Sequence, residues 1–321
     1  MNAEPKLSVR RDIDLTPWPW IKLRMTTAML DALAADIDIW NLEHPFIATP
    51  FLSEDRLTVD LRVTEFYTPP VIHWSACLGN AIGGLRSAAD AFAWQIAHLH
   101  GNSPENPNRV YFPTSASGRG WTDQLHALGK IHPDLKRRFR ELRDAQDGQW
   151  RNVITAMAML NNIDKHRSWL QISPQFEQAS LDGLSVKLGS DHGGSRMTLE
   201  PCFEQEEVTV GTVAARLRFS SPVEAANGQL RGSIAPVLSE QTAREVGLSG
   251  SALAAVANMR GALAYGFDYL CYGEPNASDF SEATPVPGTD HWMMDIESAD
   301  GTAARSGDSC GVRPRGSRPG S

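Results

Sequence analysis

The sequence predicts an α+β protein in which a bundle of about four to five helices packs with an antiparallel β-sheet. Long segments before residue 170, and one after residue 249, repeat apolar residues every three or four positions, as amphipathic helices do. Short segments after residue 184 alternate apolar and polar residues instead. Gly, Pro or Asn separates them, which is typical of antiparallel strands.

The chain is expected to form a single α+β domain with an irregular end on each side. The layout is an irregular lead-in at residues 1–20, the domain at residues 21–272 and a disordered tail at residues 275–321. Within the domain, residues 21–170 are helical, 171–245 mostly β, and 249–272 a C-terminal helix. The tail is rich in Gly, Ser, Pro and Arg, so it cannot bury a core of its own.

The first predicted helix covers residues 21–40. Its apolar stripe is Met25, Met29, Leu33, Ile37 and Trp40. Pro45 and Pro50 act as breakers that end this helical region. The segment RLTVDLRVTEF, residues 56–66, then alternates apolar and polar side chains, which predicts a strand with one buried face.

The helix predicted over residues 74–101 organises the rest of the chain. Its apolar residues recur in alternating steps of four and three: Leu78, Ile82, Leu85, Ala89, Phe92, Ile96 and Leu99. Arg86, Asp90 and Trp94 stand at i, i+4 and i+8, so they share a second face. A helix with an apolar face and an arginine–carboxylate face requires a partner for each.

The later helices supply that partner. A short helix is expected at 121–128, and another begins at Pro133, a residue suited to the first helical position. The helix predicted over 149–170 carries an apolar stripe of Trp150, Val153, Met157 and Leu160. The same face then becomes polar at Asn161 and Asp164. Because buried polar groups are costly unless paired, we expect this face to pack on the helix at 74–101.

The predicted sheet lies between the helical part and the last helix. Its candidate strands are LSVKLG, RMTLEP, EVTVGTVAARLRFSS and RGSIAPVLS, and the strand at 56–66 can join them. The final helix, at 249–272, repeats large apolar residues along one side.

Two motifs together resemble a known group of proteins. The runs WSACLGNAIGGLRSAADAFAWQIA and LNNIDKHRSWL are similar to a pair of signatures in uncharacterised bacterial and phage proteins, which read LRSALDHLAWQL and NNIDKHR. The resemblance covers roughly residues 20–170. It implies no established activity. The chain departs from the pattern at residues 80–84, which lack the usual His-Asn, and at Ala91, where a His is common.

The candidate site is a charged cluster shared by the two organising helices. Its catalytic candidates are His166, Arg167, Asp164, Arg86 and Asp90, and its ligand-binding candidates are Asn161 and Asn162. One hypothesis pairs Arg86 with Asp164 and Arg167 with Asp90, as an interhelical lock that fixes register. This reading favours a non-enzymatic structural or interaction protein.

The alternative hypothesis is a HEPN-like, metal-independent ribonuclease, acting as a toxin or a phage-defence factor. His166 would serve as acid or base and arginines would hold an anion. Ribonucleases of this type place an Arg and a His a few residues apart. Arg151 is too far from His166 for that spacing, and the one-turn pair of Asn162 and His166 lacks the preceding Arg.

A basic run offers a weaker nucleic-acid contact. Its residues are Lys136, Arg137, Arg138 and Arg140, which could bind phosphate backbone. The competing interpretation is a solvated helix face, with Asp134, Glu141 and Asp144 as intrahelical partners.

Composition and the absence of several short motifs argue against some classes of function. The 321 residues carry a net charge of −8, which argues against a general nucleic-acid-binding surface. The four cysteines form no CxxC pair, and no phosphate loop, dinucleotide fingerprint or HExxH motif occurs, so we expect no metal and no cofactor. No signal peptide or apolar run of ~18 residues is present. We therefore expect a cytoplasmic protein, with a protein partner or self-association, RNA only under the alternative, and no membrane.

Overall fold

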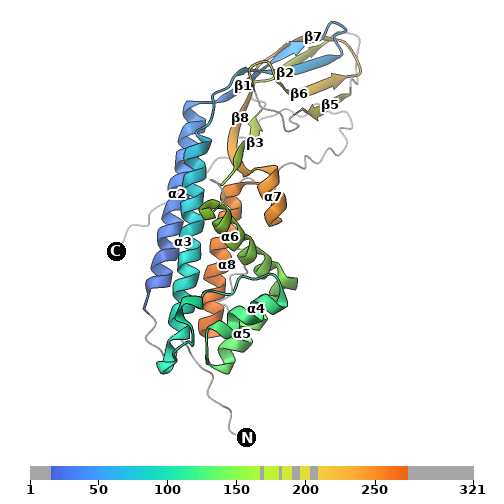
Figure 1. The fold of residues 1–321 in the computed structure, drawn as a ribbon. Helices are drawn as coiled ribbons and strands as arrows, with labels where there is room; N and C mark the ends of the chain where they lie inside the picture. The colour runs from blue at the N-terminus through green and yellow to red at the C-terminus, as the bar shows by residue number, and fades with distance from the viewer. Residues whose placement is uncertain (1–15, 167–169, 181–182, 190–195, 203–208, 274–321) are drawn as a thin grey trace, which may run out of the picture.

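The computed structural model describes residues 16–166, 170–180, 183–189, 196–202 and 209–273. This part of the chain contains seven α-helices, more than the four to five expected, and eight strands that pair antiparallel. The α+β class is therefore correct, with the sheet at one end of the helical part (Figure 1). The expected disordered tail at 275–321 lies outside the described residues.

Helices and strands segregate along the chain much as expected. The helices are α2 (Trp18–Glu43), α3 (Val71–Ala97), α4 (Gly118–Ala127), α5 (Pro133–Asp144), α6 (Gln149–His166), α7 (Glu240–Val246) and α8 (Ala252–Tyr272), with 3-10 turns η1 (Leu99–Gly101), η2 (Pro107–Arg109) and η3 (Ala145–Gly148). The strands are β1 (Phe46–Leu52), β2 (Thr58–Glu65), β3 (Ile172–Ser180), β4 (Ser185–Leu188), β5 (Met197–Pro201), β6 (Val213–Phe219), β7 (Val223–Asn227) and β8 (Leu230–Leu238).

The long helix α3 is the centre of the helical core. Six of the seven residues of its predicted stripe are fully buried: Leu78, Ile82, Leu85, Ala89, Phe92 and Ile96. The seventh, Leu99, is only partly buried, because α3 ends at Ala97 and Leu99 lies in the turn η1. The Phe92 ring stacks on Phe267 of α8 with ring centroids 4.2 Å apart, and Trp20 of α2 meets both rings edge-on. One aromatic cluster thus joins three helices.

Direct packing of α3 on α6 is also confirmed. Leu85, Phe92 and Met157 are fully buried in one hydrophobic cluster, and Val153 packs against it. Helix α6 ends at His166 in the described part of the chain, since residues 167–169 lie outside it. The face of α6 on which apolar side chains give way to Asn161 and Asp164 packs on α3, as expected.

The predicted stripe of the first helix is wrong in its N-terminal half. Met25 is 59% exposed and Met29 is exposed as well. The buried residues of α2 include Leu23, Thr26, Leu30, Leu33 and Ile37. Helix α2 carries apolar residues on two faces, so the periodicity alone could not say which face is buried. It also begins at Trp18, within the expected lead-in, with a proline in its first turn.

The main sheet has six strands in the order β3-β8-β1-β2-β6-β5, and β4 and β7 form a separate pair. The predicted strand at 56–66 matches β2 and lies inside this sheet. Strand β1 was not predicted because Pro50 reads as a breaker. It is tolerated because β8 pairs with β1 only at Phe46–Ala48, so the missing N–H of Pro50 lies beyond that ladder. Strands β3 and β7 and helix α7 were not predicted either.

The sheet has its own apolar core, and the C-terminal end of α2 ties it to the helices. Buried residues of β1, β2, β6, β7 and β8 form this second cluster, with Trp40 of α2 in contact with both cores. The Asn41 side chain donates to the Ile234 carbonyl at 3.0 Å and accepts from the Ile234 N–H at 2.8 Å. The end of α2 is thus fastened to the middle of β8.

Candidate functional site

The predicted arginine–carboxylate face of α3 forms an ion pair within that helix. Arg86 Nε donates to Asp90 Oδ2 at 2.9 Å, one helical turn apart. Arg86 Nη1 also donates to the Thr114 hydroxyl at 3.2 Å, and the Phe112 N–H donates to Asp90 Oδ1 at 3.0 Å. Both charged side chains therefore hold the irregular segment 110–115 against α3.

Two other helices bind the same 110–115 segment. The Thr155 hydroxyl of α6 donates to the Thr114 carbonyl at 2.8 Å. Gln124 of α4 accepts, through Oε1, the N–H groups of Thr114 and Ser115, each at 2.9 Å. The Phe112 ring is fully buried and lies among aromatic rings of α3, α5, α6 and α8. This segment has no regular structure, so side chains satisfy its backbone in place of a ladder.

Burial governs the electrostatics of this ion pair. The Arg86 side chain is only 13% exposed. Burial raises the pKa of Asp90, while the Arg86 charge, the Phe112 N–H and the Lys165 charge act in the opposite direction. Both charges therefore have protein partners, and through these partners the pair holds the 110–115 segment.

The expected pair of Arg86 with Asp164 does not form in the described part of the chain. Asp164 lies against α3 at Gly79, where an added Cβ would meet its carboxylate, and Asn161 lies near Gly83. Gly79 precedes Arg86 by seven residues, about 10 Å along the helix. The antiparallel register of α3 and α6 thus separates the two charges. Arg167, the expected partner of Asp90, lies outside the described residues.

The two predicted ligand-binding residues at the end of α6 differ in exposure. Asn161 is buried, whereas Asn162 and His166 are exposed. Asn162 and His166 are four residues apart and share a face of the helix. Arg86 is not available to them, because it is committed to Asp90 and Thr114. The structure therefore divides the expected cluster into a partly buried pair on α3 and an exposed pair on α6.

The basic run on α5 divides in the same way. Arg137 pairs with Glu141 at 2.7 Å and with Asp134 at 3.4 Å, as the solvated-face interpretation expected. Arg138 is buried and donates through Nη1 to the Leu270 carbonyl at 2.7 Å, so it is a wrong prediction as a nucleic-acid contact. Its guanidinium serves the C-terminal end of α8, where carbonyls lack helical partners. Lys136 and Arg140 instead face α4.

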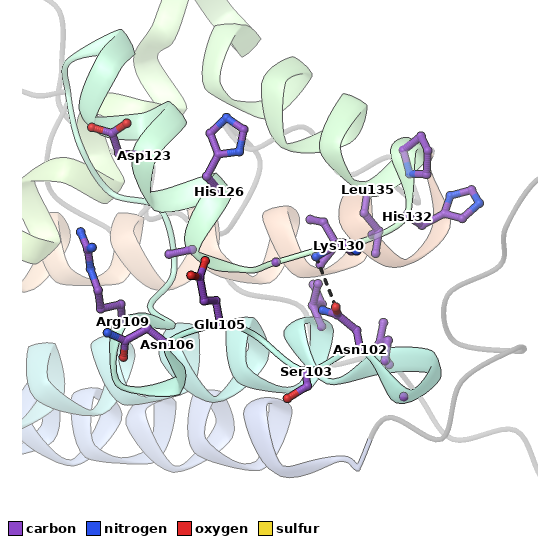
Figure 2. Close-up of a pocket in the computed structure, with 17 residues that line it drawn as sticks. Asn102, Ser103, Glu105, Asn106, Arg109, Asp123, His126, Lys130, His132 and Leu135 are labelled. Carbon is purple, nitrogen blue, oxygen red and sulfur yellow. Dashed lines mark hydrogen bonds between the residues drawn. The ribbon is translucent and has the colours of Figure 1, made fainter.

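A polar groove that sequence reasoning missed lies between the segment after α3 and the α4–α5 connection (Figure 2). Its volume is about 1000 Å³. Charged and amide side chains line it from both sides: Asn102, Glu105, Asn106, Arg109, Asp123, His126, Lys130 and His132. Asn102 accepts the Lys130 N–H at 3.3 Å and donates to the Leu128 carbonyl at 3.2 Å, which fixes the two walls together. These residues come from α4 and from the loops and turns on either side of it, so no single repeating pattern marks them.

The groove offers hydrogen bonding and charge rather than a metal site. His132 caps α5, since its Nδ1 accepts the Asp134 N–H at 3.2 Å. In the part of the chain that the structure describes, no three His, Cys, Asp or Glu side chains are grouped as a metal ion requires.

Comparisons with protein-family models, curated proteins and solved structures found no match. The resemblance of residues 20–170 to uncharacterised bacterial and phage proteins therefore stays a prediction. Among the described helices, none combines the length and the apolar character that crossing a membrane requires.

Proposed function

We propose that this protein is a non-enzymatic interaction protein that binds a helical partner along α2. The observation that carries the proposal is a second apolar row on this helix. Its members are Met25, Ala28, Ala32, Ala35, Ile39 and Leu42, in alternating steps of three and four, and all six are exposed. Such spacing is the a/d seam by which one helix packs on another.

The exposed seam repeats the pattern of the buried one. The buried residues Leu23, Thr26, Leu30, Leu33 and Ile37 have the same steps, displaced by two positions. Two residues correspond to about 200° around a helix, so the seams lie on nearly opposite sides. The buried seam packs on α3 and α8, while α2 forms an outer edge of the helical part (Figure 1). Leu42, at 82% exposure, shows how open the second seam is.

The flanks of the seam define the partner's chemistry. Asp31, Asp38 and Glu43 border it, and Arg24 borders its first turn; all four are exposed and have no ion pair among the described residues. The three alanines in the middle of the seam allow a second helix to approach closely. A second copy of α2 in parallel would set the three acidic side chains against their own kind. The partner that fits is therefore an amphipathic helix with lysines or arginines beside its apolar seam.

The ion pair of α3 supports the non-enzymatic reading. Arg86 and Asp90 are among the charges that a catalytic reading would use, and both are engaged in holding the 110–115 segment. A partly buried pair of this kind can fix the position of a segment without requiring a substrate.

Binding of a designed peptide tests this proposal. The peptide carries a Leu/Ala heptad seam with lysines at the flanking positions, and a matched peptide carries glutamates there. We expect the lysine peptide to bind the full chain and the glutamate peptide to bind at least tenfold more weakly. Ala32→Glu should abolish binding, because it places a charge in the seam.

The control variant is Asn152→Glu, on an exposed position of α6, which should bind as the wild type does. Equal binding of both peptides, or unchanged binding by Ala32→Glu, would contradict the proposal. A dimer in sedimentation that Ala32→Glu dissociates would assign the seam to a second copy instead.

A HEPN-like ribonuclease is the second candidate, favoured by the exposed pair of Asn162 and His166 on α6. This function predicts RNA cleavage without metal, and toxicity on expression. His166→Ala should then remove both effects, since the imidazole is the only proposed acid or base. Intact RNA after prolonged incubation with the folded chain would exclude this candidate.

A further inference from the structure

The exposed seam of α2 extends beyond Met25 toward the start of the helix. A step of four residues reaches Ile21, and a further step of three reaches Trp18. Trp18 is 51% exposed and Ile21 is half-buried. The seam therefore runs the whole length of α2 as a heptad repeat, with large side chains at both ends and alanines in the middle.

Charged side chains of opposite sign flank the two halves of this seam. Lys22 and Arg24 lie beside its first half, and Asp36 and Asp38 lie beside its second half. Arg24 and Asp38 are exposed and make no ion pair among the described residues. A second α2 that runs in the opposite direction brings its basic half against the acidic half of the first.

Full overlap of two antiparallel seams also matches their apolar residues. It sets the large end residues against one another and brings the alanines together near the centre. The facing pairs are Trp18 with Leu42, Ile21 with Ile39, Met25 with Ala35 and Ala28 with Ala32 of the second copy. Because a twofold axis relates the copies, each of these pairs occurs twice.

The same register pairs the charged flanks. Arg24 comes beside Asp38 of the second copy, and Lys22 comes beside Asp36 of the second copy. The twofold symmetry makes each of these opposite-sign contacts twice. Asp31 meets its own counterpart on the axis, which is a contact of like sign.

A parallel pair has neither advantage. It sets Asp31 against Asp36 and Asp38 against Glu43, which are contacts of like sign. It also places the two sheets side by side, because the sheet lies at the C-terminal end of α2 (Figure 1). The antiparallel pair places the sheets at opposite ends.

We infer that the helix bound along α2 belongs to a second copy of this chain, in antiparallel orientation. The inference rests on the proposed function, in which the seam docks a helix with basic residues beside its own seam. Lys22 and Arg24 make α2 such a helix. Lys22 also donates to the Ser87 hydroxyl, and Asp36 accepts from the Trp74 indole. An ammonium and a carboxylate each retain capacity for a further bond.

Sedimentation equilibrium of the full chain tests the inference. We expect a dimer that Ala32→Glu dissociates. Arg24→Asp and Asp38→Arg should each weaken the dimer about tenfold, because each sets like charges together across the interface. The variant with both changes should dimerise as the wild type does, since the two charges have only exchanged places.

The matched control is Glu54→Arg, a charge reversal at an exposed position of the turn between β1 and β2. It should leave the dimer unchanged. Asp31→Asn should tighten the dimer severalfold, because it removes the like-charge contact on the axis.

The outcomes separate this inference from the proposed function. A chain that sediments as a monomer at high concentration, yet binds the lysine peptide, would overturn the second copy and leave the docking of a helix in place. A monomer that binds no peptide would overturn both. A dimer that survives Ala32→Glu would overturn the use of the seam. A charge-exchanged variant no tighter than its single variants would overturn the antiparallel register.

Discussion

At Gly79 of α3, the helix has no room for a side chain, because an added Cβ would lie 2.8 Å from Asp164 Cγ. At Gly83, one turn later, the nearest atom to an added Cβ is Asn161 Oδ1 at 3.9 Å, an ordinary contact. The two glycines therefore have different reasons to be present. Only Gly79 is required by the approach of α6.

The two glycines should respond oppositely to alanine. Gly83→Ala should stabilise the protein by about 0.5–1 kcal/mol, as it does in an unobstructed helix interior. Gly79→Ala should destabilise it by about 1–3 kcal/mol, because the methyl group overlaps the Asp164 carboxylate. Urea unfolding of both variants measures the difference.

The double variant with Gly79→Ala and Asp164→Ala serves as the control for this comparison. It should recover much of the loss, since the overlapping carboxylate is gone. A Gly79→Ala variant as stable as Gly83→Ala would show that Asp164 does not lie against Gly79.

Asp90 should make stability depend on pH. Burial raises its pKa in the folded state, so the folded protein holds this proton more tightly than the unfolded chain does. Its contribution is therefore fully present below the unfolded pKa and is lost as pH rises through the folded pKa. Relative to Asp90→Asn, the wild type should lose free energy of unfolding as pH rises from 4. Urea unfolding across this range measures it, and a relative gain would mean that the Arg86 charge outweighs burial.

At the scale of the elements, the aromatic contact between α3 and α8 carries much of the helical core. Phe92 is fully buried and stacks on Phe267 at 4.2 Å. Phe92→Ala should lower the free energy of unfolding by about 3–5 kcal/mol, through lost transfer energy and the cavity left behind. Thermal and urea unfolding give the value. Trp94→Ala, at an exposed position of α3, is the control and should change little.

The elements that could be predicted are those with one apolar face. The stripe of α3 and the alternation of β2 were read correctly because each has a single buried side. Helix α2 has two apolar faces, so its buried side could not be chosen from spacing. Strand β1 contains Pro50, whose effect depends on which neighbour pairs there.

The sequence predicts which residues of the candidate site share a helix face. It does not predict which residues of different helices make contact. That Arg86 and Asp90 share a side of α3 follows from their spacing, and they do pair. Which residue of α6 meets them depends on the register of two antiparallel helices, which no local pattern reports. The polar groove is formed by residues from separate segments, so periodicity could not reveal it.

At the scale of the whole molecule, Asn41 joins the helical part to the sheet. Its amide makes both hydrogen bonds to the Ile234 backbone. Asn41→Ala leaves a backbone N–H and carbonyl of β8 without these partners, so it should cost about 1–3 kcal/mol. We also expect this variant to show two different unfolding midpoints. One is monitored by tryptophan fluorescence and the other by the circular dichroism of the sheet. Coincident transitions at unchanged stability would show that other contacts couple the two cores.

The 110–115 segment limits how the chain length can vary. Its contacts alternate between a backbone group and a side chain at fixed positions, with Phe112 in the core and Thr114 held by three helices. One inserted residue here would move Phe112 out of the aromatic cluster or Thr114 away from Arg86. The stretch at 105–109 is exposed, and among the described residues its backbone bonds are local, such as that from the Arg109 N–H to the Asn106 carbonyl. Insertions and deletions in related sequences should therefore fall before Val110. The segment 110–115 should keep its length of six residues.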